Sequence, residues 1–318
     1  MTDVNCRLVV DSDGEVPQRI LDRAGVDFIS LPYYMNDGER YDDMGETMSH
    51  AEFYRRMRGG EKVTTSAAPV TEIEEKFEEY AREGTPTVYL ALSSRISSTY
   101  NSAELVAQQV RERHPDFEIR IVDTKLMSMG EGFLDFEAMR QRRRGLTASQ
   151  LAAWAEEARW YVNCLLTVED LEYLRRGGRM PAEAGSINTA LKVNPTFSFD
   201  TEGRLSLAGV PHGRKKALKA LVSSYARCHP DGSRSDETVV IASADADKDA
   251  TWVEEHLDRP KGSIPALRWN IGASIGAHVG PGTVGIACWG PDRRGRKSLA
   301  DRIAEQAMEA EEEQAQGD

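Results

Sequence analysis

The first half of the chain alternates short apolar runs with amphipathic segments, and this alternation constrains the fold more than any other feature. Four apolar runs have the length of strands, namely 6–10, 28–34, 87–92 and 118–122. Segments with helical spacing or helix-starting residues lie between them, at 17–24, 49–57, 71–82 and 101–113. Alternation of this kind is typical of βαβ units and predicts a mostly parallel sheet flanked by helices.

The pattern changes near residue 161. After a long helix expected at 151–160, five further strands are predicted, at 162–168, 195–200, 204–207, 238–242 and 283–289. Residues 199–204 resemble a hairpin turn. A chain of 318 residues has room for about two domains of ~150 residues. We therefore expect an N-terminal α/β domain at 1–160, a C-terminal α+β domain at 161–292, and a charged tail at 293–318 that is either helical or disordered.

Composition limits the classes of function. The chain is 40% apolar and 29% charged, with a net charge of −12, which fits an ordinary soluble protein and argues against nucleic-acid binding. No apolar run is long enough for stable membrane insertion, and the N-terminus does not resemble a signal peptide. The four cysteines are widely separated and predict reduced thiols in the cytoplasm, with no zinc site (Cys6, Cys164, Cys228 and Cys288).

Three loops are expected to carry the binding residues, because ligands of parallel α/β sheets bind beyond the carboxyl ends of the strands. These loops are 11–14, 92–99 and 123–132. Hydroxyl side chains gather at Thr64–Ser66 and again at Ser93–Ser102. Either group can serve as helix N-caps, or the two can converge on one small acidic group such as a carboxylate or phosphate.

Two glycine-containing segments allow more than one interpretation. Gly272–Gly276 matches the G-x-S-x-G pattern of serine hydrolases, but His278 follows Ser274 after only four residues, and the usual acidic partner has no place between them. His278 is either structural or functional. Leu174–Arg179 is typical of a helix C-terminus, although Arg179 could instead reach an anion.

Taken together, the motifs resemble the DegV family, which also contains the acyl-carrier subunits of bacterial fatty acid kinase. The resemblance spans about residues 8–290. The motifs that carry it are Val10-Asp11-Ser12, Thr64-Thr65-Ser66, Ser93-Ser94-x-Ile96-Ser97-x-Thr99-Tyr100, Asp123-Thr124-Lys125-x-x-Ser128, Asp170-Leu171-x-x-Leu174-Arg175-Arg176-Gly177-Gly178-Arg179 and Gly276–Gly282.

The resemblance implies a protein without catalytic residues, metal or cofactor that binds a long-chain fatty acid between or within two domains, with residues 161–292 as the lipid-binding domain. Thr65 and Ser97 match the positions whose hydroxyl groups hold the carboxylate, and His278 matches the histidine beside it. Secondary candidates for the site are Ser66, Ser98, Ser128 and Arg179. Kinase-linked members of the family present the acid to a separate ATP-dependent subunit.

The chain departs from the family pattern at three places. Ala67–Pro69 stands where Gln-Pro-Ser is usual, and Ser98 stands where glycine is usual. His212 stands where members often carry an arginine. The first two differences change the loops near the carboxylate, and the third bears on a kinase partner.

A fatty acid suits these residues on physical grounds. Moving a sixteen-carbon chain out of water contributes on the order of 12 kcal/mol, from ~0.8 kcal/mol per methylene. The carboxylate then needs hydrogen-bond donors, because burying it unpaired is prohibitive. Two alternative functions remain, a nucleotide- or phosphate-binding protein and a serine hydrolase that uses Ser97 or Ser274 with His278. The first lacks the glycine-rich phosphate motifs, and the second lacks a third catalytic member.

Overall fold

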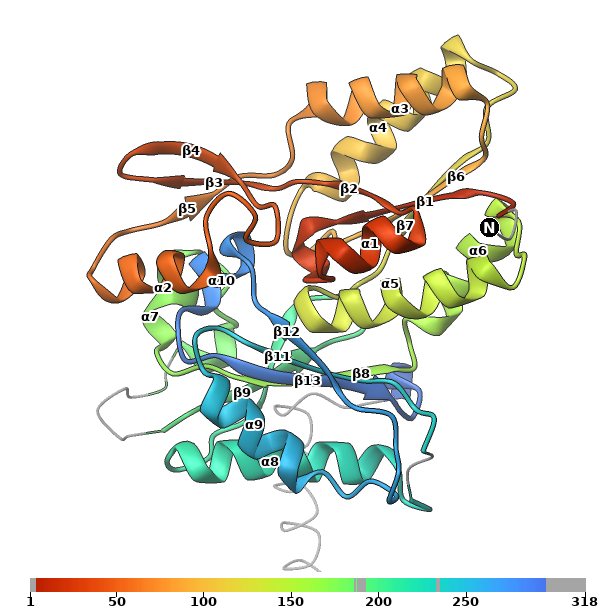
Figure 1. The fold of residues 1–318 in the computed structure, drawn as a ribbon. Coiled ribbons are helices and arrows are strands. Elements are labelled where there is room, and N and C mark those ends of the chain that lie inside the picture. The colour runs from red at the N-terminus through yellow and green to blue at the C-terminus, as the bar shows by residue number, and fades with distance from the viewer. Residues whose placement is uncertain (1–3, 186, 188–192, 233–234, 296–318) are drawn as a thin grey trace, which may run out of the picture.

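The fold has two stacked sheets, with helices between them and on both outer sides, and a small third sheet beside them (Figure 1). The computed structural model describes residues 4–185, 187, 193–232 and 235–295. From the top of Figure 1, the layers are helices α3 and α4, the first sheet, helices α1, α5 and α6, the second sheet, and helices α8 and α9. This mixed α/β architecture confirms the predicted fold class.

The first sheet is entirely parallel and has the strand order β2-β1-β6-β7. Its strands are β1 (Arg7–Asp11), β2 (Asp27–Ile29), β6 (Thr87–Ala91) and β7 (Ile119–Asp123). The predicted strand 28–34 is wrong as a single element, because the chain leaves this sheet after Ile29 and begins β3 (Pro32–Met35) in another sheet. Pro32 has no N–H to donate to a ladder, which suits the first position of a new strand.

Helices bury both faces of the first sheet. One face packs against α3 (Val70–Glu83) and α4 (Thr99–Arg113) through a core that includes Ile73, Phe77 and Val106. On the other side lie α1 (Gln18–Ala24), α5 (Ser128–Arg143) and α6 (Ala148–Ala158). Burial on both faces explains why the strands are nearly continuous apolar runs.

The second sheet is mixed, with the strand order β10-β9-β8-β13-β11-β12. Its strands are β8 (Val162–Thr167), β9 (Thr196–Phe199), β10 (Leu205–Gly209), β11 (Val239–Ser243), β12 (Leu267–Asn270) and β13 (Val284–Trp289). Helices α8 (Arg214–Cys228) and α9 (Asp247–His256) pack on its outer face. β9 and β10 form the expected antiparallel hairpin, whose turn is closed by the Asp200 carboxylate accepting from the Glu202 and Arg204 amides.

A third, small sheet lies beside the two layers and brings distant segments together. It has the order β4-β3-β5, with β4 at Gly38–Tyr41 and β5 at Thr64–Thr65. Three short helices lie next to it, α2 (His50–Arg58), α7 (Leu171–Arg176) and α10 (Ala273–Val279). β5 contacts α10, which brings the Thr65 hydroxyl to His278 in the glycine-rich segment.

Helix α5 lies between the two sheets and contacts both (Figure 1). The predicted loop 123–132 is therefore too long, because α5 already begins at Ser128. A helix that is covered on all sides shows no amphipathic stripe, so its sequence carries no helical period. Two short 3-10 helices are η1 (Ser12–Gly14), which follows β1 and packs against α5, and η2 (Ala182–Ala184), which follows α7 and contacts β10.

The change from the first sheet to the second occurs between β7 and β8, in the region where the sequence predicts a domain boundary. At the other end, Arg293 is 2% exposed and donates to the carbonyl groups of Phe199 and Arg159, so it packs against the body of the protein. A last 3-10 helix, η4, covers Arg293–Gly295. The rest of the predicted tail lies outside the described residues. In the described part of the chain, no helix combines the length and apolarity needed to span a bilayer.

Candidate functional site

The three predicted loops meet at the carboxyl edge of the first sheet. The Leu92 amide donates to Asp11 Oδ2 at 2.7 Å, which joins the ends of β1 and β6. The Ser93 amide donates to the Leu126 carbonyl at 2.8 Å, and Ser94 Oγ donates to Asp123 Oδ2 at 2.6 Å. This convergence confirms that the topology places the polar residues of these loops side by side.

Thr65 and His278 form the central contact of the candidate site. Thr65 Oγ1 lies 2.7 Å from His278 Nε2, although the two residues are 213 positions apart in the sequence. β5 supplies the threonine, and α10, in the last quarter of the chain, supplies the histidine. The tertiary fold therefore joins two motifs that the sequence presents separately.

Ser97 is connected to the Thr65 segment through a third residue. Ser97 Oγ lies 3.0 Å from Thr99 Oγ1, and Thr99 Oγ1 accepts from the Ala68 amide at 3.2 Å. The donor is the backbone amide of Ala68, at the position where the usual Gln-Pro-Ser has proline, which has no N–H to donate. This link therefore depends on the departure from the family pattern. The two hydroxyl-bearing loops are thus held together by a hydrogen bond between the Ala68 amide and Thr99.

Arg179 follows α7 and borders the candidate site next to Ser97. Its Nε and Nη2 donate to the Ile96 carbonyl at 3.2 and 3.1 Å, and its Nη1 donates to the Gly177 carbonyl at 2.7 Å. The α7 terminus also contains the expected left-handed glycine, which is Gly178 with φ of 71°. Arg179 thereby fixes the backbone next to Ser97 while its charge stays close to His278.

The imidazole of His278 is held in its neutral form. Burial and the nearby Arg179 charge lower its pKa to about 4 from an ordinary 6.5. Its Nδ1 is buried, and within the described residues it has no hydrogen-bond partner. A neutral imidazole has one N–H donor, so His278 can donate to Thr65 Oγ1 and leave the threonine proton free for another acceptor.

Gly177 sets the position of the His278 ring. A Cβ atom at residue 177 would lie 2.1 Å from His278 Nδ1, so only glycine leaves space for the ring. We expect Gly177→Ala to push the imidazole towards solvent and to raise the pKa of His278 from about 4 towards 6.5. An NMR titration of the His278 ring protons measures this shift.

Gly59→Ala is the matched control, because Gly59 also follows a helix C-terminus with a right-handed backbone. A Cβ atom at residue 59 would lie no closer than 3.2 Å to any neighbouring atom. The control should leave the His278 titration unchanged. An unaltered His278 pKa in Gly177→Ala would show that Gly177 does not position the ring.

The secondary candidates have different surroundings. Ser66 is exposed and lies 3.3 Å from the Tyr34 hydroxyl, and Ser98 is exposed at the start of α4 without a side-chain cap bond. Ser128 is buried and donates to Glu15 Oε1 at 3.1 Å, which places it in a separate group of buried acids. Ser274 is buried there too, with its Oγ 3.3 Å from Asp13 Oδ2.

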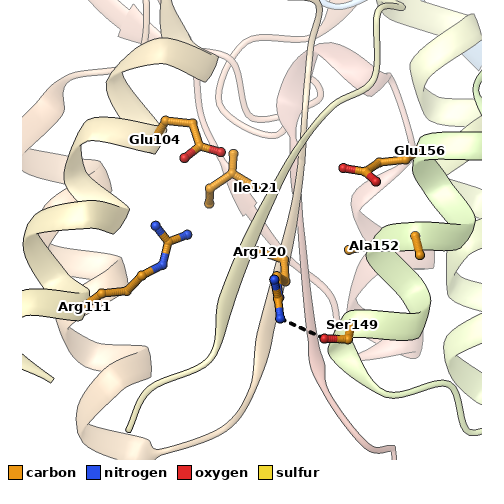
Figure 2. Close-up of a pocket in the computed structure, with 8 residues that line it drawn as sticks. Glu104, Arg111, Arg120, Ile121, Ser149, Ala152 and Glu156 are labelled. Atoms are coloured by element: carbon orange, nitrogen blue, oxygen red, sulfur yellow. Dashed lines mark hydrogen bonds between the residues drawn. The ribbon is translucent and has the colours of Figure 1, made fainter. Parts of the chain in front are cut away.

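A surface pocket lies away from this site, at the outer edge of β7 between α4 and α6 (Figure 2). It has a volume of about 320 Å³ and is lined by Glu104, Arg111, Arg120, Ile121, Ser149, Ala152, Ala153 and Glu156. Arg111 donates to the Ile119 carbonyl, and Arg120 donates to Ser149 Oγ. These arginines protect the edge strand, and the pocket contains none of the predicted site residues.

Sequence reasoning did not single out Thr99 or Gly177. Both lie inside motifs that the sequence analysis quotes, but their roles depend on contacts with Ala68 and His278. No local pattern distinguishes a hydroxyl that links two loops from one that caps a helix.

Comparison with known proteins identifies the family. The model of the family described as "Uncharacterised protein, DegV family" matches residues 5–289. The chain belongs to the DegV family. A DegV domain-containing protein of Clostridium perfringens is 29% identical over 281 residues, covering 88% of this chain and 95% of the relative. A relative from Streptococcus pyogenes is 30% identical over 288 residues, covering 90% and 99%.

Solved structures of DegV proteins share the fold. A DegV lipid binding protein of Thermotoga maritima has a TM-score of 0.78 at 26% identity, covering 91% of this chain and 99% of its own. A DegV family protein of Thermus thermophilus, whose structure is described as showing fatty acid binding, has a TM-score of 0.77 at 26% identity, covering 90% and 100%. These similar proteins are thus described as binding lipids or fatty acids.

Proposed function

We propose that this DegV protein binds one long-chain fatty acid and holds its carboxylate with the hydroxyl groups of Thr65 and Ser97, beside His278. The observation that carries the proposal is the 2.7 Å contact between Thr65 Oγ1 and His278 Nε2, together with the linkage of Ser97 to the same segment. Solved relatives described as fatty-acid-binding proteins support the ligand class.

The donors around the carboxylate are neutral. With His278 donating to Thr65 Oγ1, the Thr65 O–H points its proton at the ligand, and Ser97 can donate a second hydrogen bond. Hydrogen bonds to an ionised acceptor contribute about 1.5–3 kcal/mol each, enough to offset much of the carboxylate's desolvation. Because the pKa of His278 is about 4, affinity should not change through its titration between about pH 6 and 8.

Apolar side chains lie next to these donors, and we propose that the hydrocarbon chain lies among them. One core cluster runs from Tyr33, Phe53 and Val63 beside β5 to Ile275 and Val279 on α10. Ile96, adjacent to Ser97, packs against the same cluster. An acyl chain placed there would replace water contacts by apolar ones along its length.

The proposal includes no catalytic step. In the described part of the structure, His278 Nε2 bonds Thr65, while Ser97 bonds Thr99 and Ser274 bonds Asp13. Neither serine therefore has the histidine contact that activates a nucleophile in a serine hydrolase. We place the protein's role in binding and release of the acid.

We propose a carrier role, because uncharged donors around the carboxylate would leave the acid exchangeable. We propose that the protein presents its bound acid to a separate ATP-dependent kinase subunit. His212, where many family members have arginine, is exposed and is the position at which a partner's recognition would differ. Formation of acyl phosphate from the loaded protein, ATP and a fatty acid kinase subunit tests this step, and no product would contradict it.

Organic extraction of the purified native protein, followed by mass spectrometry, is expected to yield close to one fatty acid per chain. Calorimetric titration of the stripped protein should then give saturable one-to-one binding of that acid. A thermal-shift panel that compares nucleotides and sugar phosphates with fatty acids provides the control. Stabilisation by a nucleotide or phosphate but by no fatty acid would contradict the proposal.

A further inference from the structure

Six carboxyl groups are buried together between the first sheet, helix α5 and the start of α10. We call them the acid cluster, and each is no more than 3% exposed: Asp11, Asp13, Glu15, Asp42, Glu131 and Asp135. Asp11, Asp13 and Glu15 lie within or beside η1, and Glu131 and Asp135 lie on the face of α5 that packs against η1. The candidate fatty-acid site uses none of these residues.

Several oxygens of the cluster lack partners. Among the described residues, both carboxyl oxygens of Glu131, both of Asp135, and Asp13 Oδ1 are buried without a hydrogen bond. Burial is the largest cause that raises the pKa of Glu131, and the negative charges of Asp11 and Asp135 raise it further. The positive charge of Arg179, which lies beside the ligand site, lowers the pKa of Asp13 in part. Burial of unpaired like charges at this density is prohibitive, so protons must neutralise part of the cluster.

The other members of the cluster hold the segment that precedes His278. Glu15 Oε2 accepts from the Gly272 amide at 2.5 Å, and Asp42 Oδ2 accepts from the Ser274 amide at 2.8 Å. Asp13 Oδ2 accepts from Ser274 Oγ at 3.3 Å. Carboxyl groups from the first 42 residues thus hold the N-terminal end of α10 by hydrogen bonds, although α10 belongs to the other half of the chain.

The division of roles follows from these contacts. Burial raises the pKa of Glu15 and Asp42, and the N–H donors that face them offset part of that rise. Among the described residues, Glu131 and Asp135 have no hydrogen-bond partner to offset it. A proton on Glu131 or Asp135 removes a charge and supplies an O–H donor for a neighbouring carboxylate. If these protons were lost, the negative charges of Glu131 and Asp135 would repel that of Asp11. This repulsion would push η1 away from α5.

We propose that the acid cluster is a proton-operated lock, which keeps α5, η1 and α10 together while Glu131 and Asp135 are protonated and loosens α10 when they ionise. The lock itself needs no ligand. Because α10 also carries His278, loosening it would weaken the hold on a bound acid, a consequence that rests on the proposed function.

The sign of the pH effect follows from the direction of the shifts. Burial raises the pKa of Asp42 to about 6 and that of Asp11 to about 7, and raises the pKa of Glu131 and Asp135 well above the ordinary range. The folded protein therefore holds more protons than the unfolded chain above about pH 4. The cluster's contribution to stability is complete below about pH 4 and is lost as the pH rises through 6, 7 and beyond.

The groups around the cluster do not reverse this sign. Among the described residues, the other titratable or charged side chains that interact with it include Tyr33, Asp43, Tyr54, Tyr89 and Arg179. Burial raises the pKa of all three tyrosines, so they stay neutral over the range in which the acids titrate. Arg179 lowers the pKa of Asp13 only in part, and Asp43 raises the pKa of Asp42 further.

The double variant Glu131→Gln/Asp135→Asn tests the lock, because amides keep the shape and the donor of a protonated acid but cannot ionise. Thermal unfolding of the ligand-free full-length protein is followed from pH 5 to 9, with hydrogen exchange of residues 272–279 at each pH. We expect the wild-type melting temperature to fall steeply above pH 6 and exchange in α10 to rise. The double variant should show a clearly smaller fall, because it loses the contributions of Glu131 and Asp135 while Asp11, Asp13, Glu15 and Asp42 still titrate.

Glu112→Gln/Asp116→Asn is the matched control, since both of these acids are exposed near the end of α4. It should follow the wild-type pH profile, and a wild-type profile that is flat, or equally steep in the double amide variant, would overturn the proposal. Infrared spectra of the wild type supply a second measurement that does not depend on the variants folding. A carboxylic-acid C=O band at pH 7 supports the lock, and its absence overturns it.

A bound cation is the competing outcome. Stoichiometric metal in the purified protein, or a melting temperature at pH 8 that Mg²⁺ or Ca²⁺ raises in the wild type but not in the double variant, would replace the lock by a metal site. These readouts use the ligand-free protein, so failure of the lock leaves the proposed fatty-acid function untouched. If extraction finds no fatty acid, the pH profile still stands as a separate result.

Discussion

Gly132→Ala is expected to lower the free energy of unfolding by about 3 kcal/mol, the upper part of the range for overpacked cores. Gly132 is where α5 meets η1 most closely. A Cβ atom there would lie 1.7 Å from the Gly14 carbonyl oxygen and 2.8 Å from Trp269 Cζ3. The obstruction is backbone and a buried indole, which cannot swing aside as a flexible side chain can. Urea unfolding should show a lower midpoint with an unchanged slope.

Gly130→Ala serves as the control from the same helix. A Cβ atom at Gly130 would make ordinary contacts of 3.4 Å with Cys164 Cβ and Leu126 Cδ2. Alanine also has the higher helix propensity, so this variant should stay within about 1 kcal/mol of the wild type. Equal stability of the two variants would mean that α5 and η1 are not packed as closely as described.

Thr65→Val is expected to weaken fatty-acid binding by about 10- to 150-fold. Valine keeps the branched shape of threonine but removes the hydroxyl group that we propose donates to the carboxylate. The loss of one hydrogen bond to an ionised acceptor corresponds to about 1.5–3 kcal/mol. Calorimetry of the stripped protein with the extracted acid measures the change, and thermal unfolding without ligand shows whether the fold is retained.

Thr65→Ser is the control for this variant, since it keeps the hydroxyl group and removes only a methyl. Its affinity should stay within about threefold of the wild type, because a hydrogen bond is preserved. Wild-type affinity in Thr65→Val would refute the assignment of Thr65 as a carboxylate donor. Such a result would leave open that the protein binds the acid through other groups.

Much of the architecture follows from local sequence patterns. The apolar runs before residues 11, 92 and 123 predict strands, and the polar residues after them predict the edge where the loops meet. The run before residue 92 is apolar throughout because β6 is buried on both faces, whereas β7 exposes Arg120. Two elements depart from these patterns. Residues 28–34 contribute to strands in two different sheets. Helix α5 shows no helical period because it is enclosed between both of the large sheets.

The candidate site was partly visible in the sequence for the same reason. Hydroxyl clusters directly after apolar strands point to a ligand that needs neutral donors, and the order of the motifs is that of the DegV family. What sequence cannot display is which of these hydroxyls face one another. Thr99 links the two loops through the Ala68 amide, and Gly177 leaves space for the His278 ring.

The sequence by itself determined the class of fold, the family and the carboxyl-edge loops, because strand and helix periods and turn residues are local properties of the chain. The tertiary structure alone decided that Thr65 contacts His278 and that six acids share one buried space. Contacts between residues more than two hundred positions apart depend on how the layers stack, and burial, not residue type, sets whether a carboxyl group keeps its proton.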